Sequence, residues 1–536
     1  MRRILTALVC ILGIAPLAAA SIADPVKIDS GLVSGTAGSS ASVRVFKGIP
    51  FAAPPVGPLR WKAPHLPASW DGVRRADAFG PRCVQGGGGG GRRGAGRQGL
   101  DDGTGRQAAP QAGPPQQPMN EDCLYLNVWT AAGSAGEKRP VIVWSYGGAY
   151  TVGAGSLPQY DGEALAKKGV VFVTYNYRLG PLGFFAHPDL TKESGHNASG
   201  NYGVMDLAAA LRWVQKNIAA FGGDPARVTL MGESAGGGLL SCLVGSPQGK
   251  GLFRRAISES ATWAGVRQEA MMTLAQAEEI GKQAATKVGA ISIADLRAKP
   301  ADDILRELPA GRPIVDGWYI PEDLSIVFAQ GRQNQADVLV GSNKDEGGFP
   351  FFGLPNGNAQ QFIQQARERF GDRADQFLKL YPAGSDAQSN ASQLAAFRDE
   401  IAWGMRRWAE STARNGKGKA YLFYFTHEPP SPPGQPGRGA IHTAEIPYVF
   451  NNPPAGREWP DIDRRLADTM SSYWVHFAAN GDPNGTGLPA WPQYKPRTSE
   501  KAMILGDTVE AGTSLDAARV AFYESALGNR RTPEAH

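Results

Sequence analysis

The stretch that decides the fold is Arg227-Val228-Thr229-Leu230-Met231 followed by Gly232-Glu233-Ser234-Ala235-Gly236. The first five residues form a mostly apolar run, which predicts a buried strand. The next five have the G-x-S-x-G pattern of a nucleophile elbow, in which a serine occupies a sharp turn from strand to helix and small flanking residues avoid a clash. Because the bare pattern also occurs by chance, its position after a strand is the stronger argument. We therefore expect Ser234 to be a nucleophile, which needs a base, an acid and oxyanion donors elsewhere in the chain.

The segments around this stretch alternate between predicted strands and helices. Residues 139–144 and 170–175 predict strands, and residues 203–220 predict a helix with apolar side chains at helical spacing. This alternation predicts an α/β fold with a large, mixed, mostly parallel central sheet and helices on both faces. The stretches 265–335 and 355–415 predict helical insertions that roof the active site.

The overall charge excludes one class of partner. The chain has 536 residues, with 55 Lys and Arg against 50 Asp and Glu. Because binding to nucleic acid calls for a marked excess of positive charge, this near balance predicts no nucleic-acid partner. The length is sufficient for one large catalytic unit with a deep core.

The N-terminus has the three parts of a secretory signal peptide. Arg2 and Arg3 precede an apolar run over 4–17, and small residues follow up to Ala23. We predict a signal peptide over 1–23, cleaved after Ala20 or Ala23, and a secreted or periplasmic protein. An uncleaved anchor is the alternative, but no run reaches the about 18–20 apolar residues of a membrane span. No stable membrane insertion is expected after cleavage.

Three cysteines remain if Cys10 leaves with the signal peptide. Cys242 follows Ser234 by about two helical turns, where a buried thiol fits. Cys83 and Cys123 can pair in an oxidising compartment. No C-x-x-C motif accompanies them, so we expect no metal site. Between them, residues of about 85–118 are rich in Gly, Arg and Pro without any aromatic, which predicts a disordered insertion rather than an RNA-binding tract.

The candidate base emerges from the seven histidines. His442 follows a loop rich in Pro and Gly and comes after the serine, in the order Ser, acid, His of α/β-hydrolases. The others are expected at surface, packing or terminal positions: His65, His187, His196, His427, His476 and His536. For the acid, the predicted strand 338–340 leads into Asp345 and Glu346. Sites collect at such strand ends, but this argument does not separate the two carboxylates.

The oxyanion donors are expected from two places. One is the N–H of Ala235, directly after the nucleophile. The others would come from Gly147-Gly148-Ala149, which follows the predicted strand 139–144. An ordinary turn would also explain the two glycines.

In this order, the motifs resemble those of type-B carboxylesterases, the carboxylesterase/cholinesterase family of the α/β-hydrolase superfamily. The resemblance covers nearly all of the mature chain. Its other motifs are Phe46-Lys47-Gly48-Ile49-Pro50-Phe51-Ala52, Glu121-Asp122-Cys123-Leu124-Tyr125-Leu126-Asn127-Val128, Asn176-Tyr177-Arg178-Leu179-Gly180, Phe221-Gly222-Gly223-Asp224-Pro225, Asn343-Lys344-Asp345-Glu346-Gly347 and Gly481-Asp482-Pro483-Asn484.

The resemblance implies a serine carboxylesterase that hydrolyses small-molecule carboxylic esters through an acyl-serine, without a cofactor. Residues 24–536 would form a single catalytic domain, whose oligomeric state stays open. The implied residues are the triad Ser234, Glu346 and His442, the oxyanion donors Gly148, Ala149 and Ala235, the carboxylate Glu233 beneath the site, a Cys83–Cys123 disulfide, and the ion pairs Arg60 with Glu121 and Arg178 with Asp206.

Two departures from the family pattern narrow the substrate. Ala149 stands where the family usually has a third glycine, so its methyl group predicts poor turnover of esters of tertiary alcohols. The loop between Cys83 and Cys123 has no aromatic to hold a quaternary ammonium, which disfavours choline esters. A binding-only member of the fold would lack a triad residue, whereas Ser234, Glu346 and His442 are all present. A lipase would have an amphipathic lid, for which the sequence gives no clear candidate.

Overall fold

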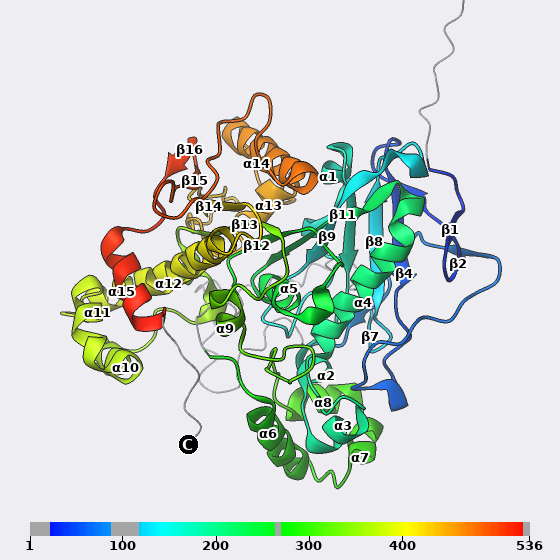
Figure 1. Ribbon diagram of the computed structural model, residues 1–536, viewed down its shortest axis with the longest axis horizontal. Helices are drawn as coiled ribbons and strands as arrows, with labels where there is room; N and C mark the ends of the chain where they lie inside the picture. Colours follow the sequence, from blue (N-terminus) through cyan, green and yellow to red (C-terminus); the bar gives the residue numbers. More distant parts are fainter. Residues whose placement is uncertain (1–21, 87–116, 263–269, 529–536) are drawn as a thin grey trace, which may run out of the picture.

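A computed structural model of the protein describes residues 22–86, 117–262 and 270–528 (Figure 1). The predicted signal peptide over 1–23 and the predicted disordered insertion of about 85–118 lie almost wholly outside the described residues.

The centre of the described structure is a sheet of eleven strands, in the order β16-β15-β14-β13-β12-β11-β9-β10-β8-β4-β3. The seven neighbours from β15 to β10 pair in parallel. They are β15 (Ala502–Leu505), β14 (Ala420–Phe425), β13 (Asp337–Asn343), β12 (Arg255–Glu259), β11 (Gly223–Glu233), β9 (Arg139–Ser145) and β10 (Val171–Tyr175).

The two edges of this sheet are antiparallel. Their strands are β16 (Val509–Gly512) at one edge and β8 (Tyr125–Thr130), β4 (Arg44–Pro50) and β3 (Thr36–Ala37) at the other. The large, mixed, mostly parallel sheet is the one that the sequence predicts. Its central strands are buried almost throughout, because helices cover both faces.

Helices pack on the two faces in separate groups (Figure 1). On one face α5 contacts β11 and α12 contacts β13, and these helices join neighbours of the same layer: α4 (Tyr202–Asn217), α5 (Ala235–Gly245), α9 (Leu324–Ala329) and α12 (Asp386–Arg414). On the other face lie α1 (Glu163–Lys167), against β10, and α14 (Asp461–Asn480), against β9 and β11.

The two stretches predicted to be helical contain several helices in their described parts, separated by a non-helical segment over 308–323 in the first. One gives α6 (Leu274–Lys287), α7 (Ile293–Ala298), α8 (Ala301–Glu307) and α9, and the other gives α10 (Ala359–Phe370), α11 (Ala374–Leu380) and α12. Figure 1 shows α6, α7 and α8 beside α2 (Gly180–Phe184) and α3 (Pro188–Glu193), whereas α10 and α11 lie at another end with α15 (Ala517–Leu527).

Element boundaries differ from the sequence expectation by a few residues. The predicted helix 203–220 is α4 and then a 3-10 turn over Ile218–Phe221, and the predicted strand before the serine extends back to Gly223. The extension carries a register shift in the pairing with β9 between Gly223 and Val228.

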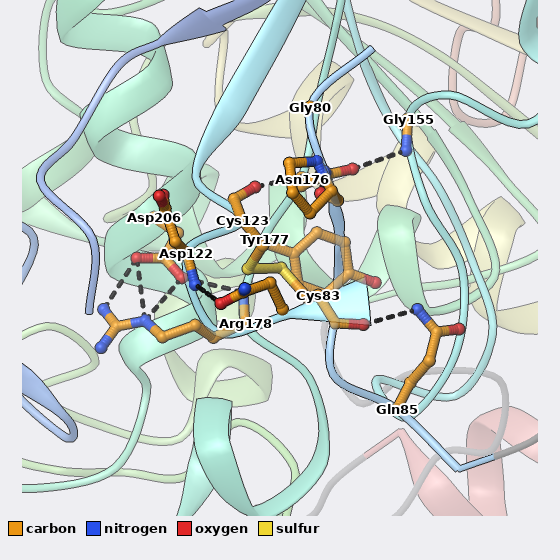
Figure 2. Close-up of a disulfide and its surroundings, with 12 residues drawn as sticks. Gly80, Cys83, Gln85, Asp122, Cys123, Gly155, Asn176, Tyr177, Arg178 and Asp206 are labelled. Atoms are coloured by element: carbon orange, nitrogen blue, oxygen red, sulfur yellow. Dashed lines mark hydrogen bonds and ion pairs between the residues drawn. A yellow bond between two sulfur atoms is a disulfide. The ribbon is translucent and has the colours of Figure 1, made fainter. Parts of the chain in front are cut away.

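The N-terminal third adds short strands around the disulfide. A small sheet contains β1 (Val26–Ile28), β2 (Gly31–Ser34) and β5 (Val73–Arg75), and β6 (Arg82–Cys83) pairs with β7 (Met119–Asn120). The expected Cys83–Cys123 disulfide is present (Figure 2). Next to it, Asn176 donates to the Cys123 carbonyl at 3.2 Å. Cys242 is free and buried.

Both expected ion pairs are present. Arg178 Nη2 lies 2.7 Å from Asp206 Oδ1 in the buried interior near the disulfide (Figure 2). Arg60 Nη2 lies 2.5 Å from Glu121 Oε1. Among the helices of residues 22–86, 117–262 and 270–528, none is long and apolar enough to cross a lipid bilayer.

Candidate active site

Ser234 lies at the turn between β11 and α5, in the position expected for a nucleophile elbow. Its backbone has φ 53° and ψ −125°, a conformation that costs an L residue about 1–3 kcal/mol. The flanking glycines are required by close packing: a Cβ on Gly232 would lie 2.7 Å from the Gly236 carbonyl carbon, and one on Gly236 would lie 1.9 Å from the Ser145 carbonyl oxygen. The serine N–H donates to Glu259 O at 2.9 Å, which ties the turn to β12.

The structure brings His442 and Glu346 together. His442 Nδ1 lies 2.5 Å from Glu346 Oε2, and both side chains are buried. Glu346 lies three residues after the end of β13, and its other oxygen accepts the N–H of Asn343, the last residue of that strand, at 2.9 Å. The imidazole therefore has one nitrogen fixed by a carboxylate that is itself fixed by the backbone.

Asp345, the neighbouring carboxylate, has a different contact. Its Oδ2 accepts the N–H of Ala440 at 2.9 Å, so it holds the loop that carries His442 without contacting the imidazole. The contact with His442 therefore belongs to Glu346, the carboxylate that the family resemblance implies and that the strand-end argument left undecided.

The second nitrogen of the imidazole faces another carboxylate. His442 Nε2 lies 2.9 Å from Glu233 Oε1, but without hydrogen-bond geometry. Among the described residues neither atom has a hydrogen-bond partner, so no Ser234–His442 hydrogen bond is formed in this arrangement. Such bonds are often long or misaligned until substrate binds.

The turn after β9 presents the expected oxyanion donors. Gly148 and Ala149 have φ of 107° and 53°, and a Cβ on Gly148 would lie 2.1 Å from Val152 O. Within the described part of the chain, the N–H groups of Gly148, Ala149 and Ala235 donate to no protein group. A Cβ on Gly147 would lie 2.9 Å from the Ser234 Cβ, so this turn packs directly against the serine.

Comparison with known proteins places this arrangement in a family. Residues 23–523 match the model of the Carboxylesterase family. The chain belongs to the carboxylesterase family. It is 38% identical to a fumonisin B1 esterase of Sphingopyxis macrogoltabida, over 91% of this chain and 87% of that protein. It is 35% identical to the para-nitrobenzyl esterase of Bacillus subtilis (strain 168), over 88% of this chain and 93% of that protein.

Solved structures agree with this assignment. A PNB esterase structure superimposes with a TM-score of 0.74 at 32% identity, over 91% of this chain and 97% of that one. A Geobacillus stearothermophilus carboxylesterase gives a TM-score of 0.75 at 30% identity, over 93% of this chain and 99% of that one. The protein is therefore a carboxylic ester hydrolase with an α/β-hydrolase fold.

A cavity of about 960 Å³ opens above Ser234 and His442 in this carboxylesterase. Phe349 and Phe352 line it and lie with ring centroids 5.6 Å and 4.9 Å from the His442 ring. Met271 and Arg312, from segments that flank α6–α8, line another part. The helical insertions therefore contribute walls through their flanking loops, and the volume suits a small-molecule ligand.

More buried carboxylates lie near the carboxylesterase site than we expected from the sequence. Besides Glu233 and Glu346, Glu259 and Glu445 are fully buried near it. Glu259 is paired in register with Glu233 across β11 and β12, and it accepts from Trp474 Nε1 at 2.8 Å. A glutamate ending an otherwise apolar strand was the available signal for Glu259, and position three residues after His442 was the signal for Glu445. The described residues hold no group of three or more His, Cys, Asp or Glu placed to bind a metal ion.

Burial and the charges of neighbouring groups shift the pKa values of Glu445, Glu259 and His442. Burial, then Glu233 and Glu346, raises the pKa of Glu445 to about 8, although Asn343 opposes the shift. Burial, then Glu445, raises the pKa of Glu259 well above its usual range. Burial lowers the pKa of His442, but the carboxylates of Glu233 and Glu346 outweigh it and hold that pKa well above the usual 6.5.

Proposed function

We propose that this carboxylesterase hydrolyses small-molecule esters through an acyl-enzyme on Ser234, with His442 as general acid and base and Glu346 as its orienting carboxylate. The observation that carries the proposal is the 2.5 Å contact between His442 Nδ1 and Glu346 Oε2, beside an elbow serine under a cavity. The similarity to a fumonisin B1 esterase and a para-nitrobenzyl esterase, both named for small-molecule esters, supports small esters as the substrate class.

In the proposed cycle, His442 takes the Ser234 hydroxyl proton through Nε2 while Oγ attacks the ester carbonyl. The N–H groups of Gly148, Ala149 and Ala235 would stabilise the negative oxygen. His442 then gives the proton to the leaving alcohol, and the C–O bond breaks to leave acyl-Ser234. Water repeats the sequence and releases the carboxylic acid.

Because His442 contacts Glu233, the proposed mechanism requires a movement of the His442 imidazole. Nε2 faces Glu233, so a small rotation or shift of the imidazole has to bring it to Ser234 Oγ. Glu233 would then stabilise the imidazolium that forms during each proton transfer, because an opposite charge within about 4–6 Å favours the charged form. Its role is electrostatic in this mechanism.

We also propose that choline esters are not the preferred substrates. The described residues of the loop between Cys83 and Cys123, 84–86 and 117–122, contain no aromatic side chain. A quaternary ammonium would therefore find no ring there for a cation–π contact.

We also infer export and a single catalytic domain over 24–536. The disulfide suits an oxidising compartment. One apolar core contains residues from Ile22 to Leu505, which supports a single folding unit for most of the chain.

The test of the proposed function is turnover of a neutral short-chain aryl ester by the wild type and by Ser234→Ala. The proposal expects loss of essentially all enzymatic turnover in the variant, at least about 10⁴-fold. Ser241→Ala is a matched control, because Ser241 is buried on α5 and its hydroxyl donates to Gly237 O at 2.7 Å. Comparable rates in wild type and Ser234→Ala contradict the proposal.

A further inference from the structure

The charged side chains that line the cavity are strongly biased in sign. Apart from His442, the charged residues of its described lining are one carboxylate and four arginines: Glu233, Arg82, Arg312, Arg438 and Arg457. Glu233 lies against His442, so it does not neutralise the arginines. We propose, on the basis of the function above, that the preferred ester carries a free carboxylate away from the bond that is broken.

Arg82 is fixed close to the catalytic turn. Its Nη2 donates to Gln85 Oε1 at 3.1 Å, and Gln85 exchanges two hydrogen bonds of 2.8 Å with the backbone of Gly153. Gly153 belongs to the loop that follows Gly148 and Ala149. Among the described residues Arg82 forms no ion pair, and its buried Nε has no hydrogen-bond partner there. A half-buried guanidinium is thus held near the proposed oxyanion donors, with no acidic partner in the described part of the chain.

Arg438 and Arg457 are exposed and come from the two loops that precede and follow His442 in the sequence. Arg457 Nη1 donates to the Pro430 carbonyl at 3.3 Å, so it links the two loops. Within the described part of the chain neither arginine forms an ion pair. Both guanidinium groups therefore retain donors for a ligand.

Two acidic side chains lie close to Arg438 but do not neutralise the positive charge of the cavity lining. Glu428 and Asp345 approach the backbone at Gly437 and Gly439, on either side of Arg438. Neither lines the cavity, and Asp345 is already occupied with the Ala440 N–H. Arg312 has an interaction of its own, so the inference uses Arg82, Arg438 and Arg457.

Three arginines that have no acidic partner among residues 22–86, 117–262 and 270–528 line one cavity, and such a lining favours anionic ligands. Guanidinium presents paired donors that match the two oxygens of a carboxylate, and such charge-assisted bonds are stronger than neutral ones. A cavity lined by one sign of charge also concentrates ligands of the opposite sign. The whole chain has a net charge of only +5, so the bias belongs to the cavity rather than to the composition.

The experiment uses two pairs of esters, each pair equal in size and different in charge. In the first, the phenyl half-ester of adipic acid is compared with its terminal carboxamide, which places the charge on the acyl part. In the second, meta-carboxyphenyl butyrate is compared with meta-carbamoylphenyl butyrate, which places it on the alcohol part. The full-length mature enzyme is assayed, and the readout is the kcat/KM ratio of carboxylate to carboxamide.

We expect a ratio of about ten or more in at least one pair, since tenfold corresponds to about 1.4 kcal/mol, within the range of one charge-assisted hydrogen bond. The pair that shows it identifies the acyl or the alcohol side. The ratio should fall toward one in Arg438→Gln/Arg457→Gln and in Arg82→Gln. It should also fall between about 0.01 M and 1 M salt, because the Debye length shrinks from about 30 Å to about 3 Å.

Arg367→Gln is the matched control, because Arg367 is exposed on α10 and does not line the cavity. It should leave the ratio unchanged. A ratio at or below one in both pairs, or a high ratio that the cavity variants do not lower, overturns the inference. If no ester of either pair is hydrolysed, or if wild type and Ser234→Ala hydrolyse them equally, the proposed function itself fails.

Discussion

His442 Nε2 lies 2.9 Å from Glu233 Oε1, while Glu346 contacts the other nitrogen of the same ring. The imidazole is therefore held between two buried carboxylates, one on each nitrogen. This arrangement stabilises the protonated ring, whereas attack by Ser234 requires the neutral one.

The first prediction concerns pH. Burial lowers the pKa of His442, but Glu233 and Glu346 together raise it well above 6.5. Because only the neutral imidazole acts as a base, kcat/KM for a neutral ester should rise with pH through a midpoint above that value. Glu233→Gln removes one of the two charges, so its midpoint should move to lower pH. Rate profiles of both enzymes decide this, and a midpoint that stays in place in Glu233→Gln contradicts the electrostatic role.

The second prediction separates the two adjacent carboxylates. Glu346→Gln replaces the carboxylate that orients the imidazole and should lower kcat by about 10³–10⁴-fold. Asp345→Asn is the matched variant, since Asp345 bonds only to the loop backbone, and it should lower kcat less than tenfold. Steady-state kinetics with circular dichroism as a folding check measure both. Equal losses, or a larger loss in Asp345→Asn, would remove Glu346 from the mechanism.

The third prediction concerns Ala149. Its φ of 53° is in the left-handed region, where glycine is accepted without strain, so Ala149→Gly should preserve the turn. Removal of the methyl group makes room beside the acyl carbonyl. The variant should gain activity on esters of tertiary alcohols relative to esters of primary alcohols, measured as a ratio of kcat/KM values. An unchanged ratio means that the methyl group does not limit the substrate.

The fourth prediction concerns the mature N-terminus. Ile22 is only 3% exposed and belongs to the main core, with its Cδ1 3.5 Å from the position of a Cβ on Gly222. Cleavage after Ala23 would remove this contact, so we expect cleavage after Ala20 and a mature chain that begins at Ser21. Intact mass of the exported protein tests this. A mass that corresponds to a start at Asp24 contradicts it.

Much of the fold was predictable because its signals are local. The run 227–231, the glycines around Ser234 and the helical spacing in 203–220 each reflect forces that act within a few residues. The α/β architecture follows from the order of such segments. Boundaries were less predictable: β11 extends back to Gly223 because it pairs with Arg139 of β9, a partner far away in sequence.

The residues of the site also differ in how far the sequence predicts them. Ser234, His442 and the Gly148–Ala149 turn follow from motif and order. The choice of Glu346 over Asp345 came only from the family resemblance, because local physics does not show which of two neighbours faces the imidazole. Glu259 and Glu445 were missed because a buried carboxylate has no sequence mark until its neighbours are known. The arginines of the cavity were missed for the same reason, since they come together from positions as distant as Arg82 and Arg457.

Rapid quenching during turnover of a slowly deacylating aryl ester, followed by peptide mass spectrometry, detects an acyl-enzyme on Ser234. We expect the mass of the acyl group on the peptide that contains Ser234, and its absence from the same peptide of Ser234→Ala. Product release without this label, or a label on another residue, would contradict the proposed mechanism.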